Sequence, residues 1–180
     1  GTNIPIKQLG SRLTHWMTRI PEAVFNFSFR AHCVQAAQTV LYSGFYAPLA
    51  VHRQTTGRRV YYCHTIPRFA YDLYGVSRAS FPWVLRGLFG CFVAAVRWQY
   101  KRAIQKMDLV LVNSENVRTR LKHFLDIDAQ VLYPPVATGQ FQWASDGGYY
   151  LSVARLTPNK RVDTIVRAFL KMPERRLVVA

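Results

Sequence analysis

Short apolar runs recur along the chain, and most are separated by segments long enough to form a helix. Most of these runs are rich in β-branched and aromatic residues and lack the alternating polar positions of a strand with one face in water. We expect strands at 39–42, 59–63, 109–112, 131–133, 149–153 and 177–179. Because strands and helices alternate, the sequence predicts an open α/β fold built on a parallel sheet with both faces covered.

The clearest long helix is predicted over residues 81–106. Apolar residues fall roughly at helical spacing at Val84, Leu85, Leu88, Phe92, Ala95 and Val96. The second half is basic, with Arg97, Lys101, Arg102 and Lys106. Two interpretations fit this pattern: a helix lying on an anionic membrane surface, or a core-packed helix with a solvated basic face. The longest apolar stretch, 87–96, is too short to cross a bilayer, which needs about 20 residues.

Pro134 and Pro135 mark a domain boundary, because proline interrupts both helices and central strands. We assign residues 1–135 to an N-terminal domain, 136–147 to a linker and 148–180 to the start of a second domain. One βαβ unit cannot bury its own sheet, so we expect the second domain to be incomplete. The opening residues lack an obvious first strand, which points to a truncated start as well.

The composition is globular and strongly basic. Hydrophobic residues make up 50% and aromatic residues 14%, which excludes a disordered chain. The chain has 24 Lys and Arg against 9 Asp and Glu, a formal charge of +15. Such a field attracts nucleic acid, acidic lipid headgroups or phosphorylated substrates, and charge alone does not choose among them.

The cysteines and the N-terminal region suggest a location in the cell. Cys33, Cys63 and Cys91 are odd in number and match no zinc or redox spacing, so we expect reduced, mostly buried thiols in a reducing compartment. Arg12 and Arg19 interrupt the early apolar runs, so no secretory signal is evident. We therefore expect a cytoplasmic protein, peripheral at the cytoplasmic face of a membrane.

Small, polar or cationic residues follow the predicted strands, where open parallel sheets bind ligands. The candidate site residues are Ser43, Gly44, His64, Arg68, Asn113, Ser114, Arg155 and Lys160. Arg155 leaves a strand and Lys160 follows at the start of a predicted helix, a setting suited to a diphosphate. The alternative is two solvated cations in a basic chain. His64 suits hydrogen bonding or proton transfer, and the alternative is a packed histidine bonded to backbone.

Several chemistries have no sequence support. The chain contains no Gly-rich dinucleotide fingerprint, no Walker loop and no Gly-x-Ser-x-Gly elbow. It has no metal-ligand cluster, and its scattered acids offer no glycosidase pair. We therefore expect neither a metal nor another cofactor.

Three motifs resemble segments of glycosyltransferase family 4 in the same order. The run YYCHTIPRFAYD at 61–72 resembles a motif of members that act on polysaccharide and glycolipid precursors. The runs DLVLVNSENVR and LYPPV, within 108–136, resemble the end of the acceptor domain. The run GYYLSVARLTPNKRVD at 148–163 resembles the opening of the donor domain. The similarity extends over residues 40–180.

The resemblance implies a GT-B fold, in which two Rossmann-like domains face each other across a cleft. It implies a retaining hexosyltransferase that moves a sugar from a nucleotide sugar to a lipid-linked or polysaccharide-precursor acceptor. Arg155 and Lys160 would hold the donor diphosphate in place of a metal, and His64 would lie at the cleft as the catalytic residue. Ser43, Gly44 and Ser114 would line the acceptor side. The CHTIPR run alone favours a mannosyl donor.

The sequence departs from the family in a few places. Ala154 replaces the usual glycine before the donor-site arginine, and Ile66 replaces a proline common after the His-Thr pair. The acidic segment that holds the donor sugar would lie beyond residue 180, so we expect these 180 residues alone to be inactive. Two alternatives stand beside the enzyme: a non-catalytic glycosyltransferase-like protein, and a basic nucleic-acid-binding protein that lacks a recognisable motif.

Overall fold

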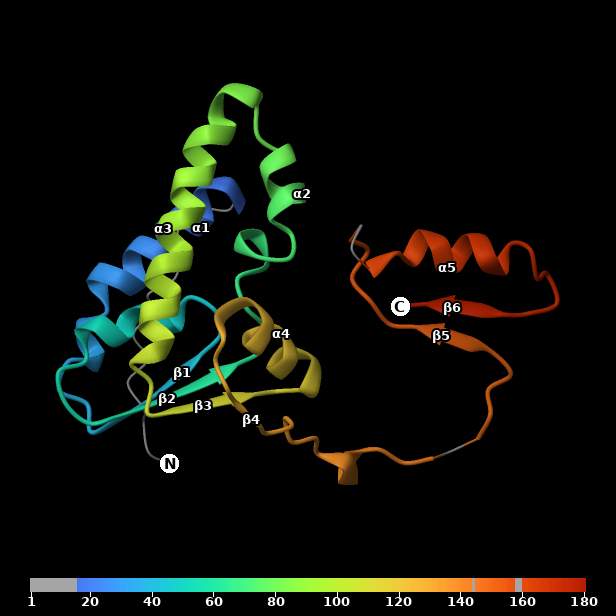
Figure 1. Ribbon diagram of the computed structural model, residues 1–180. Helices are drawn as coiled ribbons and strands as arrows, with labels where there is room; N and C mark the ends of the chain where they lie inside the picture. The colour runs from blue at the N-terminus through green and yellow to red at the C-terminus, as the bar shows by residue number, and fades with distance from the viewer. Residues whose placement is uncertain (1–15, 144, 158–159) are drawn as a thin grey trace. The chain divides into compact units, whose positions relative to one another are not determined.

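The computed structural model describes residues 16–143, 145–157 and 160–180. The chain forms two compact units, Gly1–Pro135 and Val136–Ala180, which are described separately below as unit 1 and unit 2. Unit 1 is a mixed α/β structure with a four-stranded parallel sheet, which is compatible with a Rossmann-like fold (Figure 1). No helix in the described part of the chain is long and apolar enough to cross a membrane.

The sheet of unit 1 has the strand order β1-β2-β3-β4, with all neighbouring strands parallel. The strands are β1 (Thr39–Ser43), β2 (Arg58–Cys63), β3 (Leu109–Val112) and β4 (Gln130–Val131). All four strands predicted for this region are confirmed within two residues at either end. The last is shorter than expected: Leu132 still donates its N–H to the Val112 carbonyl at 2.8 Å, and the prolines that follow cannot extend the ladder.

The helices of unit 1 pack on one face of this sheet (Figure 1). They are α1 (Trp16–Phe25), α2 (Tyr74–Ala79), α3 (Arg86–Gln105) and α4 (Glu115–Leu125), with a short helix η3 (Ala47–Arg53). The predicted long helix is confirmed as α3. It starts later than predicted because Pro82 is extended, with ψ 143°, and a single turn, Trp83–Leu85, precedes the helix.

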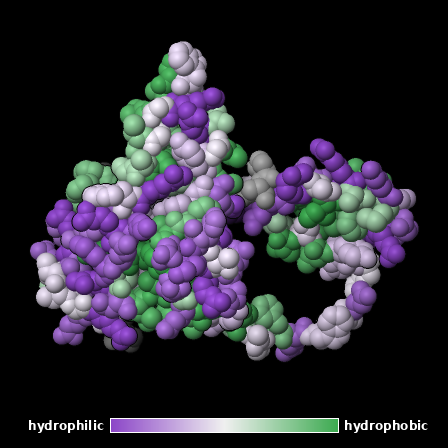
Figure 2. Space-filling view, in the orientation of Figure 1, coloured by the Kyte–Doolittle hydropathy of each residue, from purple (hydrophilic) through white to green (hydrophobic). Residues whose placement is uncertain are grey.

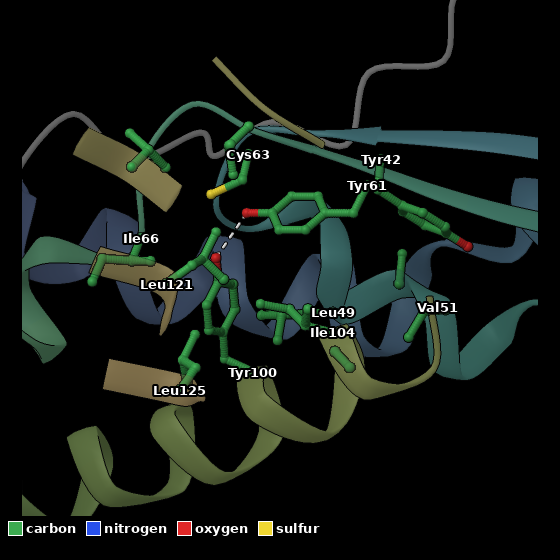
Figure 3. Close-up of a cluster of buried hydrophobic side chains, with 14 of the residues drawn as sticks. Tyr42, Leu49, Val51, Tyr61, Cys63, Ile66, Tyr100, Ile104, Leu121 and Leu125 are labelled. Carbon is green, nitrogen blue, oxygen red and sulfur yellow. Dashed lines mark hydrogen bonds between the residues drawn. The ribbon is translucent and has the colours of Figure 1, made fainter. Parts of the chain in front are cut away.

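Alternate strand residues form the main core together with these helices. Tyr42, Tyr61, Cys63 and Val112 point to the helical face and are at most 2% exposed. They meet buried residues of η3, α3 and α4, namely Leu49, Val51, Tyr100, Ile104, Leu121 and Leu125 (Figure 3). Burying this apolar surface is the main term that holds the sheet to its helices.

The opposite face of the sheet differs from the expectation that both faces are covered. Leu41, Val60 and Leu109 are in register across β1, β2 and β3 on this face. Leu41 is 62% exposed, and Val60 and Leu109 are only partly buried. The apolar runs of the sequence therefore have one uncovered side within the described residues, which periodicity alone does not reveal.

A second cluster fixes the end of α3 that lies away from the sheet. Phe89, Val93 and Val96 of α3 are buried there against Phe69 and Ala70. This packing holds the α2–α3 hairpin upright from the sheet (Figure 1).

The cysteines correct one expectation. All three are free, but only Cys63 is buried, whereas Cys33 and Cys91 are exposed. Burial raises the pKa of the Cys63 thiol, so this sulfur stays protonated and is a poor nucleophile.

Unit 2 consists of a parallel strand pair and one helix. These are β5 (Tyr150–Ser152), α5 (Val162–Phe169) and β6 (Leu177–Val179). The predicted order of strand, helix and strand is confirmed. Tyr150 packs its ring against Phe169 with 5.2 Å between the ring centroids, so the helix covers one side of the pair.

The buried tyrosine pair generates the first prediction. The hydroxyls of Tyr61 and Tyr100 are 2.7 Å apart, and both rings are fully buried. Tyr61→Phe or Tyr100→Phe leaves the other hydroxyl with only the weak thiol of Cys63, so we expect each to lower the free energy of unfolding by about 1–3 kcal/mol. In urea denaturation, the double variant should lose less free energy of unfolding than the two single variants lose together. Strict additivity would show that the two hydroxyls do not interact.

Candidate functional site

A serine and a histidine meet at the carboxyl edge of the unit 1 sheet. Ser43 ends β1, and His64 directly follows β2. Ser43 Oγ and His64 Nε2 are 3.0 Å apart, and either can donate, depending on the histidine tautomer. His64 is exposed, and its ring meets Tyr62 edge-on at 4.8 Å. The imidazole is therefore oriented by two contacts although the residue is exposed.

Gly44 turns the chain away from the sheet after β1. Its φ is +88°, a conformation that favours glycine. No atom lies within 4 Å of the position of a Cβ at Gly44, so space does not exclude a side chain here. The backbone conformation, which carries the chain past Ser43, is what requires glycine.

An ion network holds the loop that follows His64. Ile66 and Pro67 are buried and anchor the loop. Asp72 accepts from Arg68 Nε at 3.0 Å and from Arg120 at 2.9 Å. The predicted site residue Arg68 therefore helps to hold this loop through its ion pair with Asp72, although its side chain is 52% exposed.

Arg120 and Asp72 were not among the residues singled out from the sequence. Arg120 also donates to Thr65 Oγ1 at 3.1 Å, so it ties α4 to both ends of the His64 loop. Asp72 closes the YYCHTIPRFAYD run and could have been chosen from it. Arg120 has no such signal, because 48 residues separate it from Asp72 and only the fold brings them together.

Asn113 and Ser114 lie at the same sheet edge, after β3. Asn113 N donates to the Cys63 carbonyl at 3.3 Å, next to His64. Ser114 is the N-cap of α4: its Oγ accepts from Val117 N at 3.4 Å and donates to Asn113 Oδ1 at 3.2 Å. The Ser114 hydroxyl is therefore engaged by the helix that it starts.

Arg155 and Lys160 belong to unit 2 and are both exposed. They lie in the loop between β5 and α5, where Thr157 N donates to the Arg155 carbonyl and Lys160 N to the Thr157 carbonyl. The helix begins at Val162, so Lys160 lies before the helix rather than in its first turn. Arg161, with φ +52°, bends the chain into the helix and separates Lys160 from it.

An open hollow of about 850 Å³ lies beside the start of α5. Its described lining residues are Leu156, Thr157, Arg161, Val162, Asp163, Val166 and Arg167. Arg155 and Lys160 are not among them. Asp163 lies in the first turn of the helix, 3.9 Å from Arg161 and 3.8 Å from Arg167. Its negative charge offsets part of the positive charge of the two arginines and of the helix N-terminus.

The structure thus brings some of the predicted residues together and not others. Ser43 and His64 are in direct contact, and Arg68, Asn113 and Ser114 lie on the segments that follow β2 and β3. Arg155 and Lys160 share one loop in the other unit. Within the residues that the structure describes, no cluster of three His, Cys, Asp or Glu side chains suits a metal ion.

Comparisons with known proteins assign no family to this arrangement. No protein-family model matches the chain, and neither a curated protein nor a solved structure is significantly similar to it. The geometry of the two units therefore carries the functional argument, together with the motifs in the sequence.

The cap at Ser114 generates the second prediction. Ser114→Ala removes the acceptor for Val117 N, and we expect the free energy of unfolding to fall by about 1 kcal/mol. Ser114→Asp restores an acceptor and should keep most of the stability in the same denaturation experiment. Equal losses in the two variants would contradict the capping role.

Proposed function

We propose that this chain is part of a retaining glycosyltransferase of GT-B architecture, similar to glycosyltransferase family 4. The observation that carries the proposal is the contact between Ser43 and His64 at the carboxyl edge of a parallel sheet. This edge is where open α/β sheets bind their ligands, and His64 is exposed there with its Nε2 held against the Ser43 hydroxyl. The YYCHTIPRFAYD run that contains it supplies the resemblance to enzymes that act on glycans.

In this proposal, the reaction breaks the bond between the sugar C1 and the diphosphate oxygen and forms a bond from C1 to an acceptor hydroxyl. The acceptor proton leaves with the nucleoside diphosphate. His64 donates a hydrogen bond to a sugar hydroxyl, and Ser43 selects the ring orientation that allows it. The configuration at C1 is retained.

Arg155 and Lys160 would stabilise the negative charge of the leaving diphosphate. Protein cations can take the place of a metal in this role. Both side chains are exposed, so an anion can reach them without displacing a partner of either unit's core. The resemblance of the YYCHTIPRFAYD run favours a lipid-linked or polysaccharide-precursor acceptor, and the CHTIPR part of it alone favours a mannosyl donor.

The third prediction concerns the diphosphate. The double variant Arg155→Ala with Lys160→Ala should weaken binding of a nucleoside diphosphate at least tenfold by calorimetry, since a charged hydrogen bond contributes about 1.5–3 kcal/mol. The matched control is Lys171→Ala with Arg175→Ala, which removes two exposed cations of the same unit. Equal weakening in both pairs would mean that only overall charge attracts the ligand.

The fourth prediction concerns the histidine. In a protein that carries this chain together with the acidic donor segment, His64→Ala should lower kcat for sugar transfer by roughly a hundredfold, as expected for a residue that acts on the transition state. Ser43→Ala should cost less, because the imidazole keeps its contact with Tyr62. Full activity of His64→Ala would remove the residue from the catalytic site.

A further inference from the structure

The solvent face of α3 is apolar where a surface helix is normally polar. Leu88 is 71% exposed and Trp98 is 62% exposed, and the face between them carries Cys91 and Ala95, which are also exposed. These residues are opposite the buried residues of the same helix. A helix exposed to water on that side would be expected to present charged or polar side chains there.

The turn before the helix extends this apolar surface. Trp83 is 80% exposed and Val84 is 61% exposed, at the far end of the α2–α3 hairpin. Figure 1 shows that this end projects away from the sheet, and Figure 2 shows hydrophobic residues there among pale and hydrophilic ones. The buried cluster behind α3 holds the hairpin in place. Contiguous apolar surface of this kind marks a docking site.

The charges around this surface have one sign. Residues 73–107 contain the six cations Arg78, Arg86, Arg97, Lys101, Arg102 and Lys106 and no Asp or Glu. Arg97 is turned toward the protein, where it donates to the Ala70 carbonyl and stacks on Tyr74 at 5.0 Å. Arg86 donates to the carbonyls of Phe81 and Ala79. Lys101, Arg102 and Lys106 are exposed at the end of the helix near the sheet, where an anionic partner can reach them.

A basic hollow adjoins the apolar face at that end. It measures about 380 Å³ and is lined by Ser28, Phe29, His52, Arg53, Trp98, Gln99, Arg102 and Lys106. The Arg102 guanidinium lies 4.7 Å above the Trp98 ring, so cation and aromatic ring form one continuous patch. The pKa of His52 is lowered, first by burial and then by the nearby charges of Lys106 and Arg102. Both cations are therefore close to His52 in this hollow.

We propose that the solvent face of α3, with Trp83 and Val84 at its tip and the basic hollow at its base, docks on an anionic lipid bilayer. A bilayer surface offers both apolar depth and negative headgroups, and tryptophan favours its interface. A second copy of the chain would bring together two surfaces of the same positive sign, because a two-fold interface uses the same patch on both copies. Nucleic acid would satisfy the cations and leave the apolar residues in water.

The most direct test places an environment-sensitive fluorophore on Cys91. In Cys33→Ser, Cys91 is the exposed thiol, since Cys63 is buried. Vesicles containing phosphatidylglycerol should shift the emission of the label to the blue, and vesicles of phosphatidylcholine alone should not. The control carries the label on the exposed strand β4, in Cys33→Ser with Cys91→Ser and Gln130→Cys, and should not shift. A shift of both labels, or of neither, would overturn the proposal.

Vesicle sedimentation separates the two parts of the surface. Trp83→Asp with Leu88→Asp should lower the partition coefficient at least tenfold, whereas Leu132→Asp with Leu156→Asp, exposed apolar residues elsewhere, should leave it within about threefold. Lys101→Gln with Arg102→Gln should lower the partition coefficient about thirtyfold at low salt, since each cation near the bilayer surface raises affinity about fivefold. The loss should be smaller at high salt, which screens these charges.

Two outcomes would overturn the docking surface. Equal losses in the two aspartate pairs would mean that the apolar face has no special role. A dimer in sedimentation velocity that Trp83→Asp with Leu88→Asp converts to a monomer would identify a second copy as the occupant. These readouts involve no sugar transfer, so their outcome is independent of the proposed activity.

Discussion

The packing of alternate strand residues against α3 and α4 is the constraint on which the rest of unit 1 depends. Tyr61 and Tyr100 share a hydrogen bond at the centre of this layer, where a polar contact must be satisfied inside an apolar core. The layer fixes the register of β1 against β2, and this register brings Ser43 beside His64. The same layer anchors the C-terminal half of α3 through Tyr100 and Ile104. The outer face of this helix is therefore held in a fixed position.

Much of this architecture could be predicted from local patterns. The strands and α3 follow from apolar runs and helical spacing, because such signals come from neighbouring residues. The contact between Ser43 and His64 could not be predicted, since 21 residues separate them and only the parallel register brings them together. The same holds for Arg120 and Asp72. The delayed start of α5 depends on the left-handed conformation of Arg161, which no preference of arginine would indicate.

The expectations that the structure overturns share a physical origin. An apolar run indicates that a strand can be buried, but not which layer covers each side, and Leu41 is exposed. A cysteine is usually buried, yet Cys91 lies on the outer face of α3. In α3 the exposed apolar residues point to a further partner, because the other side of the helix is already packed in the core. The surrounding cations favour a negatively charged partner.

Both proposed surfaces rely on exposed cations, Arg155 and Lys160 in one and Lys101, Arg102 and Lys106 in the other. The measurement that tests the central proposal most directly is a nuclear magnetic resonance titration with a panel of nucleotide sugars, performed on a protein that carries this chain together with the acidic donor segment. The account predicts that one of them shifts the ring signals of His64 and the amide signals of Arg155 and Lys160, while the free sugar does not. No shift at these residues with any nucleotide sugar would contradict the assignment as a glycosyltransferase.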